Sequence, residues 1–201
     1  MKNIFKLFIL MGIMLLTFIQ PSPAQAWSVS THHDIAREIY YSFPSDVQEN
    51  LSLDAMIDGS DDPDLKFMDF KYHHYPATTV KIEHWLDKGE KYYNNGEFEK
   101  ASYCFGVASH YISDSFCAPH CVEDKKDILK INHNIYELRA VFLKPQISHN
   151  EGTFIDRINK GKSSAEKNWD EWNKSGDNIL IQTDLNHAAS AAFSEISKRI
   201  K

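Results

Sequence analysis

The segment His110–Glu137 contains two histidine–carboxylate pairs with the same spacing, HYISD at residues 110–114 and HNIYE at residues 133–137. In an α-helix, residues four positions apart project from one face, with Cβ atoms about 5–6 Å apart. His120 lies between the two pairs, directly after Pro119. Imidazole and carboxylate repeated on two successive helical segments predict a metal cluster built from helix side chains.

Hydrophobic residues follow the helical period along most of the chain. The pattern predicts a first helix capped by Ser30 or Thr31, and it gives no strand of useful length and no internal repeat. Further helices are expected at about residues 45–56, 79–94, 97–115, 124–142, 154–172 and 179–200. The sequence therefore predicts an all-α fold, a single-domain bundle of about seven helices.

A run of turn-forming residues at 59–64 predicts a loop that continues to Pro76. Long loops inside compact domains usually carry function. The candidate ligands of this loop are Asp64, with Asp61, Asp62 and Asp69 as competitors, and His73 or His74. His32 or His33 adds a candidate near the N-terminus. The expected ligands thus come from four separate parts of the chain.

Residues 1–26 have the pattern of a secretory signal peptide. Two lysines precede an apolar run at residues 7–19, and Ala-Gln-Ala at residues 24–26 provides a small-residue cleavage site. The run is shorter than the roughly 20 residues of a typical membrane span, and a retained anchor is the alternative. Cleavage would leave residues 27–201 as one exported domain that begins with Trp27.

The charge of the chain disfavours a nucleic-acid partner. The full sequence has a net charge of −6, and loss of the two leader lysines leaves 20 Lys and Arg against 28 Asp and Glu, a net charge of −8. Nucleic-acid backbones are bound mainly by clusters of positive charge. A nucleic acid is therefore a less expected partner.

Three cysteines leave one thiol over in any pairing. In an oxidising compartment, Cys117 and Cys121 could form a disulfide across the bend at Pro119. Cys104 would then remain buried and free.

The donors at the regular positions are nitrogen and oxygen atoms. This set suits zinc, although ligand type alone also allows manganese, iron or cobalt. Eight or nine donors exceed what one tetrahedral ion needs, so at least two ions are implied and three are expected. Asp114 lies in the middle of the series, where a carboxylate can bridge two ions. Two metal ions about 3.5–4 Å apart can clamp the oxygens of a phosphodiester.

These residues resemble the zinc-dependent phospholipase C family of secreted bacterial enzymes, which shares its fold with the P1/S1-type nucleases. The resemblance extends from Trp27 to about Leu138. Its motifs are an N-terminal Trp (Trp27), T-H-x-x-I (Thr31–Ile35, which selects His32), an aspartate after proline (Pro63-Asp64), a histidine before an aromatic residue (His74-Tyr75, with His73 close behind), H-Y-x-x-D (His110–Asp114), P-H (Pro119-His120) and H-x-x-x-E (His133–Glu137).

The resemblance implies three zinc sites. The first would be held by Asp64, His74 (or His73), His110 and Asp114; the second by Trp27, His32 and Asp114; and the third by His120, His133 and Glu137. In that family the free amine and carbonyl of the N-terminal Trp bind zinc. The resemblance also implies that Asp64 is the general base or orients the attacking water.

The expected function is secreted, zinc-dependent hydrolysis of a phospholipid or another phosphodiester by a monomer with transient membrane-surface contact. A P1/S1-type nuclease is one alternative, although such nucleases usually carry Asp where Glu137 stands. A non-enzymatic secreted zinc-binding protein is the other. Ser30 and Leu65 replace an acid and an aromatic residue of the family, so the headgroup is not fixed by the sequence.

Overall fold

The computed structural model describes residues 26–122, 130–148 and 152–200. The regular elements in these ranges are α2 (Val29–Tyr41), α3 (Ser45–Gln48), α4 (Leu53–Asp62), the π-helical turn η1 (Pro63–Phe67), the 3-10 turn η2 (Phe70–Tyr72), α5 (Thr79–Asn94), α6 (Phe98–Asp114), α7 (Ala118–Cys121), α8 (Ile131–Ala140), α9 (Phe154–Ser175) and α10 (Asn178–Ser197). No strand occurs among these described residues, which confirms the all-α prediction. The expected signal peptide, apart from Ala26, lies outside the described residues.

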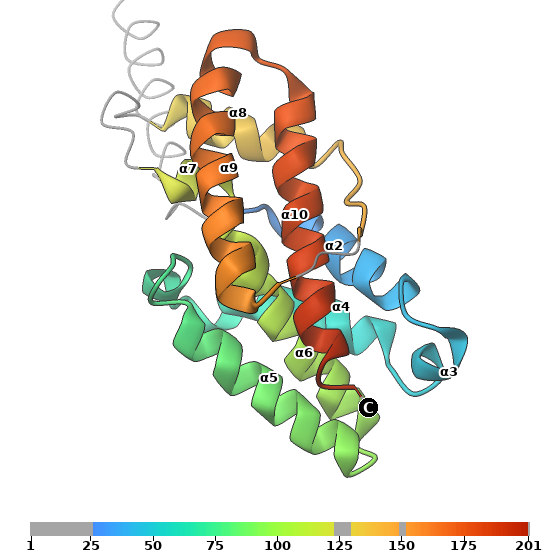
Figure 1. Cartoon of the computed structure of the whole chain (residues 1–201). Coiled ribbons are helices and arrows are strands. Elements are labelled where there is room, and N and C mark those ends of the chain that lie inside the picture. The colour runs from blue at the N-terminus through green and yellow to red at the C-terminus, as the bar shows by residue number, and fades with distance from the viewer. Residues whose placement is uncertain (1–25, 123–129, 149–151, 201) are drawn as a thin grey trace, which may run out of the picture.

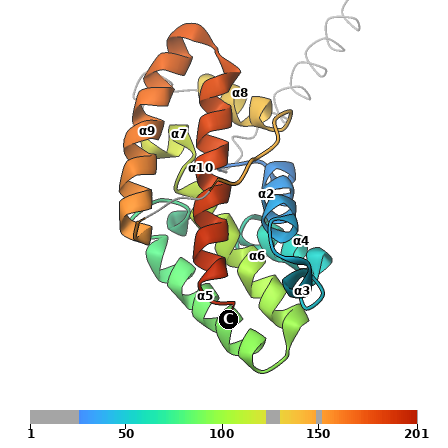
Figure 2. The same ribbon diagram turned by 45° about the vertical axis from the view of Figure 1, so that its right-hand side comes forward.

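Helix α6 is the centre of the fold. All its residues from Cys104 to Asp114 are buried, and it packs against α2, α4, α5 and α10. Figures 1 and 2 show α5 running alongside α6, with α10 crossing in front of it. A helix that is buried all round has no solvated face, so its polar residues must bond inside the protein. The C-terminal end of α6 therefore places His110 and Asp114 in the interior.

Residues 59–67, the first part of the segment predicted as a loop, are helical instead. α4 continues to Asp62, and η1 follows directly. A Cβ atom on Gly59 would lie 2.1 Å from the carbonyl oxygen of Tyr103, and one on Gly106 would lie 2.1 Å from that of Met56. Both glycines therefore allow α4 and α6 to touch backbone to backbone. Composition alone read Gly59 as a helix breaker, whereas its role is close packing.

Several expected boundaries shift by a few residues because other side chains cap the helices. Ser28, rather than Ser30 or Thr31, caps α2 by accepting a hydrogen bond from the Thr31 amide. Ser52 caps α4, so the helix expected over residues 45–56 is divided into α3 and α4. The helix expected from residue 124 begins at Ile131, because Lys130 before it has a left-handed backbone conformation (φ 51°), and residues 123–129 lie outside the described ranges.

The helices α9 and α10 form an antiparallel pair that covers α7 and α8 (Figures 1 and 2). Thr153 begins α9 with a capping box, and Gly176 ends it at a φ of 67°. Beneath this pair, the ring of Tyr136 on α8 packs against Trp169 and Trp172, with centroid distances of 5.7 and 5.1 Å. This aromatic cluster fixes α8 to the rest of the bundle.

The predicted Cys117–Cys121 disulfide is absent, and both residues are free thiols. Cys117 precedes the one-turn helix α7 and Cys121 ends it. Their thiols donate to different backbone carbonyls, Cys117 to Ala26 at 2.9 Å and Cys121 to Ser115 at 3.4 Å. The two thiols therefore have different partners and are not bonded to each other. Cys104 is buried and free, as predicted.

Candidate metal centre

An inner cluster forms around Asp114 at the end of α6. His110 comes from the preceding turn of α6, His32 from α2, Asp64 from η1, and His73 follows η2. The Asp114 carboxylate lies 3.3 Å from His32 Nε2, 2.8 Å from His73 Nδ1 and 3.2 Å from His110 Nε2. Three imidazoles therefore converge on one carboxylate, and all five side chains are buried.

Several atoms of the inner cluster lack hydrogen-bond partners. Both carboxylate oxygens of Asp64 and of Asp114 are buried and unpartnered, as is Nε2 of His32. Asp64 Oδ1 lies 3.6 Å from His73 Nδ1 and 3.8 Å from His110 Nε2. Buried carboxylate oxygens are costly without a donor or a cation. These atoms form two overlapping groups of metal-ligand geometry, His32–His110–Asp114 and Asp64–His73–His110.

The surroundings of His32 and Asp114 favour the protonation states in which these two side chains bind metal. Burial and the neighbouring His110 lower the pKa of His32 to about 4. Burial opposes ionisation of Asp114, but His110 and His32 hold the pKa of that carboxyl well below its usual range. Metals bind neutral imidazole and ionised carboxylate. His32 and Asp114 are therefore in the required forms at neutral pH.

Hydrogen bonds on the far side of two imidazoles orient them toward Asp114. His110 Nδ1 donates to the carbonyl of Ser60 at 2.7 Å, and His32 Nδ1 lies 3.2 Å from the Ser113 hydroxyl. Both bonds leave Nε2 directed at the cluster, an arrangement typical of metal-ligating histidines. The sequence did not indicate the contact with Ser60, because that residue was expected in a loop.

An outer cluster lies between α7 and α8. His133 Nε2 and His120 Nε2 approach one oxygen of Glu137, at 2.6 and 3.5 Å, and the two nitrogens are 3.1 Å apart. His74 stacks on His120 with a centroid distance of 4.7 Å. A carboxylate and two imidazoles that share one point in space fit a single cation. This cluster contains the second of the two pairs with i, i+4 spacing.

The structure places His73, rather than the favoured His74, beside Asp64 and Asp114. His73 is fully buried, whereas His74 is exposed and belongs to the outer cluster. The backbone turns tightly through η2, so consecutive side chains point in different directions. Sequence spacing could not resolve that choice. The carboxylate of Asp69, 3.6 Å from His73 Nε2, supports the ring from the other side.

The competing residues have other partners. His33 pairs with Asp61 at 2.7 Å, outside the inner cluster. Asp62 and Asp69 each accept a hydrogen bond from a tyrosine hydroxyl and pair with a lysine. Of the four acids considered for the loop position, Asp64 is the one whose two oxygens both lack hydrogen-bond partners.

Trp27 is fully buried beside the inner cluster. Its indole Nε1 donates to the carbonyl of Ser113 at 3.0 Å, and the Ser113 hydroxyl contacts His32. In the full-length chain the Trp27 nitrogen forms a peptide bond with Ala26, so the expected metal-binding amine exists only after cleavage. The position of Trp27 is compatible with that role, which stays a prediction.

A model of the family described as zinc dependent phospholipase C matches residues 31–186. The chain belongs to the zinc-dependent phospholipase C family. No curated protein and no solved structure matches it. The family match over residues 31–186 confirms the resemblance inferred from the motifs.

The family implies zinc, and the residues present fit that metal. The unpartnered oxygens of Asp64 and Asp114 and the oriented imidazoles provide the nitrogen and oxygen donors that zinc binds. The outer cluster adds a third donor group, formed by Cys117, His120 and Glu137.

Within the described ranges, no helix has the length and hydrophobicity needed to cross a membrane.

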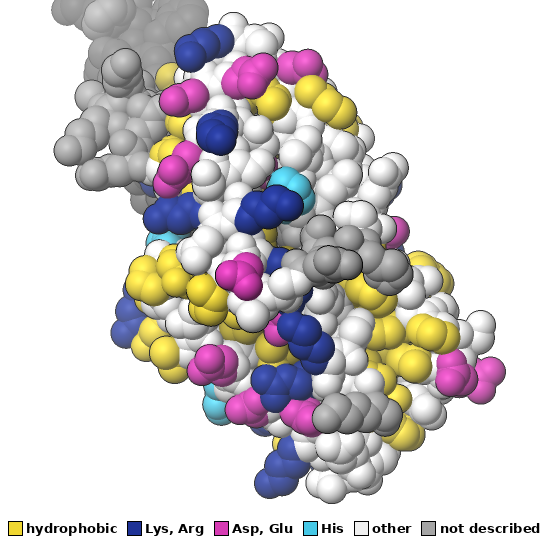
Figure 3. Space-filling model, in the orientation of Figure 1, with side chains coloured by type: hydrophobic (Ala, Val, Ile, Leu, Met, Phe, Trp, Pro, Cys, Tyr) yellow, Lys and Arg dark blue, Asp and Glu magenta, His cyan; other side chains and the backbone are white. Residues whose placement is uncertain are grey.

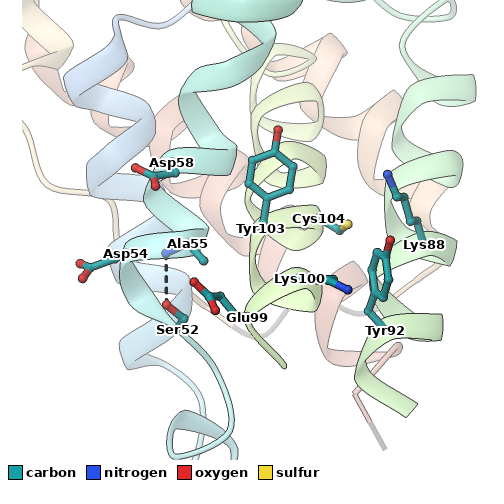
Figure 4. A pocket seen from close by; sticks show the side chains of 10 residues that line it. All are labelled: Ser52, Asp54, Ala55, Asp58, Lys88, Tyr92, Glu99, Lys100, Tyr103 and Cys104. Carbon is teal, nitrogen blue, oxygen red and sulfur yellow. Dashed lines mark hydrogen bonds between the residues drawn. The ribbon is translucent and has the colours of Figure 1, made fainter. Parts of the chain in front are cut away.

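A separate cavity of about 440 Å³ lies between α4, α5 and α6 (Figure 4). Its lining combines acids, lysines and a buried thiol, including Asp58, Lys88, Glu99, Lys100 and Cys104. None of the predicted metal ligands lines this cavity. This cavity is therefore separate from the two clusters.

Proposed function

We propose that this family member is a secreted, zinc-dependent phosphodiester hydrolase that cleaves phospholipids. The observation that carries this proposal is the inner cluster, in which three imidazoles converge on Asp114 while four buried carboxylate oxygens have no hydrogen-bond partner. Zinc ions held there would supply Lewis acidity toward the phosphate oxygens and would lower the pKa of water.

Asp64 is the proposed general base. Its buried carboxylate lies at the edge of the inner cluster, close to His73 and His110. In the proposed reaction, water attacks phosphorus while the bond from phosphorus to the glycerol oxygen breaks. Asp64 accepts the proton from the water and returns it to the glycerol oxygen. The products are diacylglycerol and the phosphorylated headgroup.

The outer face of α8 supports a lipid substrate. Four apolar side chains share this face and its continuation, and they are 37–80% exposed: Ile131, Ile135, Leu138 and Phe142. The opposite face carries His133 and the buried Tyr136. A polar and metal-binding inner face with an apolar outer face would bring the outer cluster close to a phospholipid surface.

The charge distribution supports lipid over nucleic acid. On the face shown in Figure 3, Lys and Arg side chains are interspersed with Asp and Glu, so that face has no continuous basic surface. The net charge of −8 expected for the mature chain would repel a polyanion. A nuclease of the P1/S1 type remains the second candidate function because it would use the same clusters.

Three substrates assayed with and without a chelator test the proposal. The mature chain should hydrolyse phospholipid vesicles in a chelator-sensitive reaction, and it should cleave single-stranded DNA and a soluble phosphodiester much more slowly. Cleavage of DNA alone would support the nuclease. Zinc binding without cleavage of any of the three substrates would support a non-enzymatic role.

The role of the α8 face is tested by Leu138→Glu and Phe142→Glu. A charge at either position should reduce binding to vesicles and hydrolysis of vesicle lipid by about tenfold, while hydrolysis of a soluble phosphodiester stays unchanged. Tyr41→Glu is the matched control, because Tyr41 is 62% exposed on α2. An equal effect of all three substitutions would contradict the assignment of this face.

Secretion and metal assembly are linked in this proposal. An α-amino group has a pKa of about 7.7–8.0 and can lose its proton to a metal. Cleavage after Ala26 would create such an amine at Trp27. A chain extended before Trp27 should therefore bind one zinc ion fewer and lose most activity. Full zinc content and activity in the extended chain would refute the link.

A further inference from the structure

Cys117 belongs to the outer cluster by geometry, although its sequence position gave no reason to place it there. Its sulfur, a ring nitrogen of His120 and a carboxylate oxygen of Glu137 all lie within 4.8 Å of one another. The side chains of these residues are 0%, 2% and 14% exposed. His133 Nε2 lies 2.6 Å from the same Glu137 carboxylate. Cys117, His120 and Glu137 thus form one donor group, and His133 contacts two of its members, His120 and Glu137.

The local fold explains why the thiol is available there. Cys117 is the residue before α7, and His120 is three positions later on the same helical turn. His133 and Glu137 come from one face of α8. The second cysteine, Cys121, donates to the carbonyl of Ser115 instead.

We propose that Cys117 is the fourth protein ligand of the ion in the outer cluster, together with His120, His133 and Glu137. The inference rests on the proposed function in that it requires an ion at this position. Four protein ligands complete the tetrahedral shell of zinc, a feature of structural sites, whereas catalytic sites keep one position open. The outer ion would therefore hold α7 to α8, and open coordination positions would be confined to the inner cluster.

Leader cleavage would release the thiol for this role. In the full-length chain, Cys117 donates to the carbonyl oxygen of Ala26 at 2.9 Å. Ala26 is the last residue of the expected signal peptide, so cleavage removes that acceptor. Burial raises the pKa of the Cys117 thiol well above its usual value, and a coordinated zinc ion would displace the proton. The processed chain would thus exchange a hydrogen bond for a metal bond.

Cobalt substitution tests the proposal. In the mature chain loaded with Co²⁺, a thiolate ligand should produce a sulfur-to-cobalt charge-transfer band in the near ultraviolet. Cys117→Ser should abolish this band and increase the rate at which a chelator removes one ion by at least about tenfold. Cys121→Ser, a change four residues away, should alter neither observation.

A second variant keeps the test independent of the folding of Cys117→Ser. In the double variant Cys104→Ala/Cys121→Ser, Cys117 is the remaining thiol, so persistence of the band assigns it to this residue. A cobalt-loaded mature chain without the band, or a chain that binds no cobalt, would overturn the inference. Hydrolysis measured on the same samples separates the two proposals, because an active chain without the band refutes only the role of Cys117.

Discussion

The inner and outer clusters contain the same sequence element in two different environments. His110 and Asp114 lie on the fully buried end of α6, whereas His133 and Glu137 lie on the short helix α8, whose outer face is apolar and exposed. The inner cluster draws its donors from four segments and uses only imidazole and carboxylate. The outer cluster uses two neighbouring short helices and His74, and it has a thiol within reach.

Residue spacing therefore identifies a histidine–carboxylate ligand pair, but the surroundings of the pair determine its chemistry. Three imidazole nitrogens lie within 3.3 Å of the Asp114 carboxylate, whose two oxygens have no hydrogen-bond partner, so this carboxylate can bridge two ions. The Glu137 oxygen already faces His120 and His133, and the Cys117 sulfur lies within 4.8 Å of donor atoms of His120 and Glu137. We therefore assign the proposed hydrolysis to the inner cluster and a structural role to the outer ion.

The largest effect is expected from Asp114→Asn. The substitution keeps the size of the side chain but removes the negative charge on which His32, His73 and His110 converge. kcat/KM for a soluble phosphodiester should therefore fall by about a thousandfold, or about 4 kcal/mol. Asp87→Asn is the control, because Asp87 is a 66% exposed partner of Arg199. Retention of full zinc content and of more than a tenth of the activity in Asp114→Asn would contradict the bridging role.

A smaller loss is expected from Glu137→Gln. This variant should lose the outer ion while the inner ions remain, and its activity should decrease by about 10–100-fold through loosening of α7 and α8. Zinc content per chain and hydrolysis are measured together. Glu83→Gln, an exposed change on α5, is the matched control. Equal loss of zinc from the two clusters would show that they do not bind independently.

Substitutions at two glycines, Gly106 on α6 and Gly161 on α9, test whether the inner region around α6 is packed more rigidly than the outer region. A Cβ atom on Gly106 would meet the backbone of Met56 at 2.1 Å, whereas one on Gly161 would meet the side chain of Phe116 at 2.1 Å. A side chain can move more easily than two packed helices. Gly106→Ala should therefore lower the free energy of unfolding by about 1–3 kcal/mol, and Gly161→Ala by less. Chemical denaturation measures both, and the reverse order would contradict a rigid inner region.

Features set by residues close together in the chain could be predicted from the sequence, whereas contacts between distant segments could not be predicted from local patterns. The pairs His110–Asp114 and His133–Glu137 follow from helical periodicity alone, as does the all-α fold. The convergence of His32 and Asp64 on the same point required the family motifs, because no local pattern reports a contact between distant segments. The prediction from composition that Gly59 breaks the helix was also wrong.

The remaining errors concern the direction of single side chains. His73 and His74 are adjacent, and only the turn at η2 decides which of them faces Asp114. Cys117 was considered for a disulfide, since its proximity to His120 and Glu137 depends on how α7 is placed against α8. Such choices are set by backbone geometry, which residue spacing does not specify.

The smallest predicted effect concerns Asp184, which supports the outer region from α10. It accepts hydrogen bonds from Tyr136 at 2.7 Å and from Asn168 at 2.6 Å, and burial raises its pKa from 3.8 to about 7. The folded state therefore favours the protonated carboxyl. This contribution to stability is fully present below about pH 4 and is lost as the pH rises to about 7, at no more than about 1.4 kcal/mol per pH unit.

Asp184→Asn should remove this dependence because an amide does not titrate. The free energy of unfolding, measured by denaturation at several pH values, should decrease less steeply from about pH 4 to pH 7 in the variant than in the parent chain. Parallel profiles would show that Asp184 ionises normally in the folded protein, and the supporting role assigned to its protonated form would then be wrong.

The most direct test of the central claim is the zinc content of the mature chain, measured by elemental analysis beside Asp114→Asn and Glu137→Gln. The account predicts about three ions per chain in the parent, the loss of one outer ion in Glu137→Gln, and the loss of inner ions in Asp114→Asn. A folded mature chain that contains less than one zinc ion, and takes up no more when zinc is added, would contradict it.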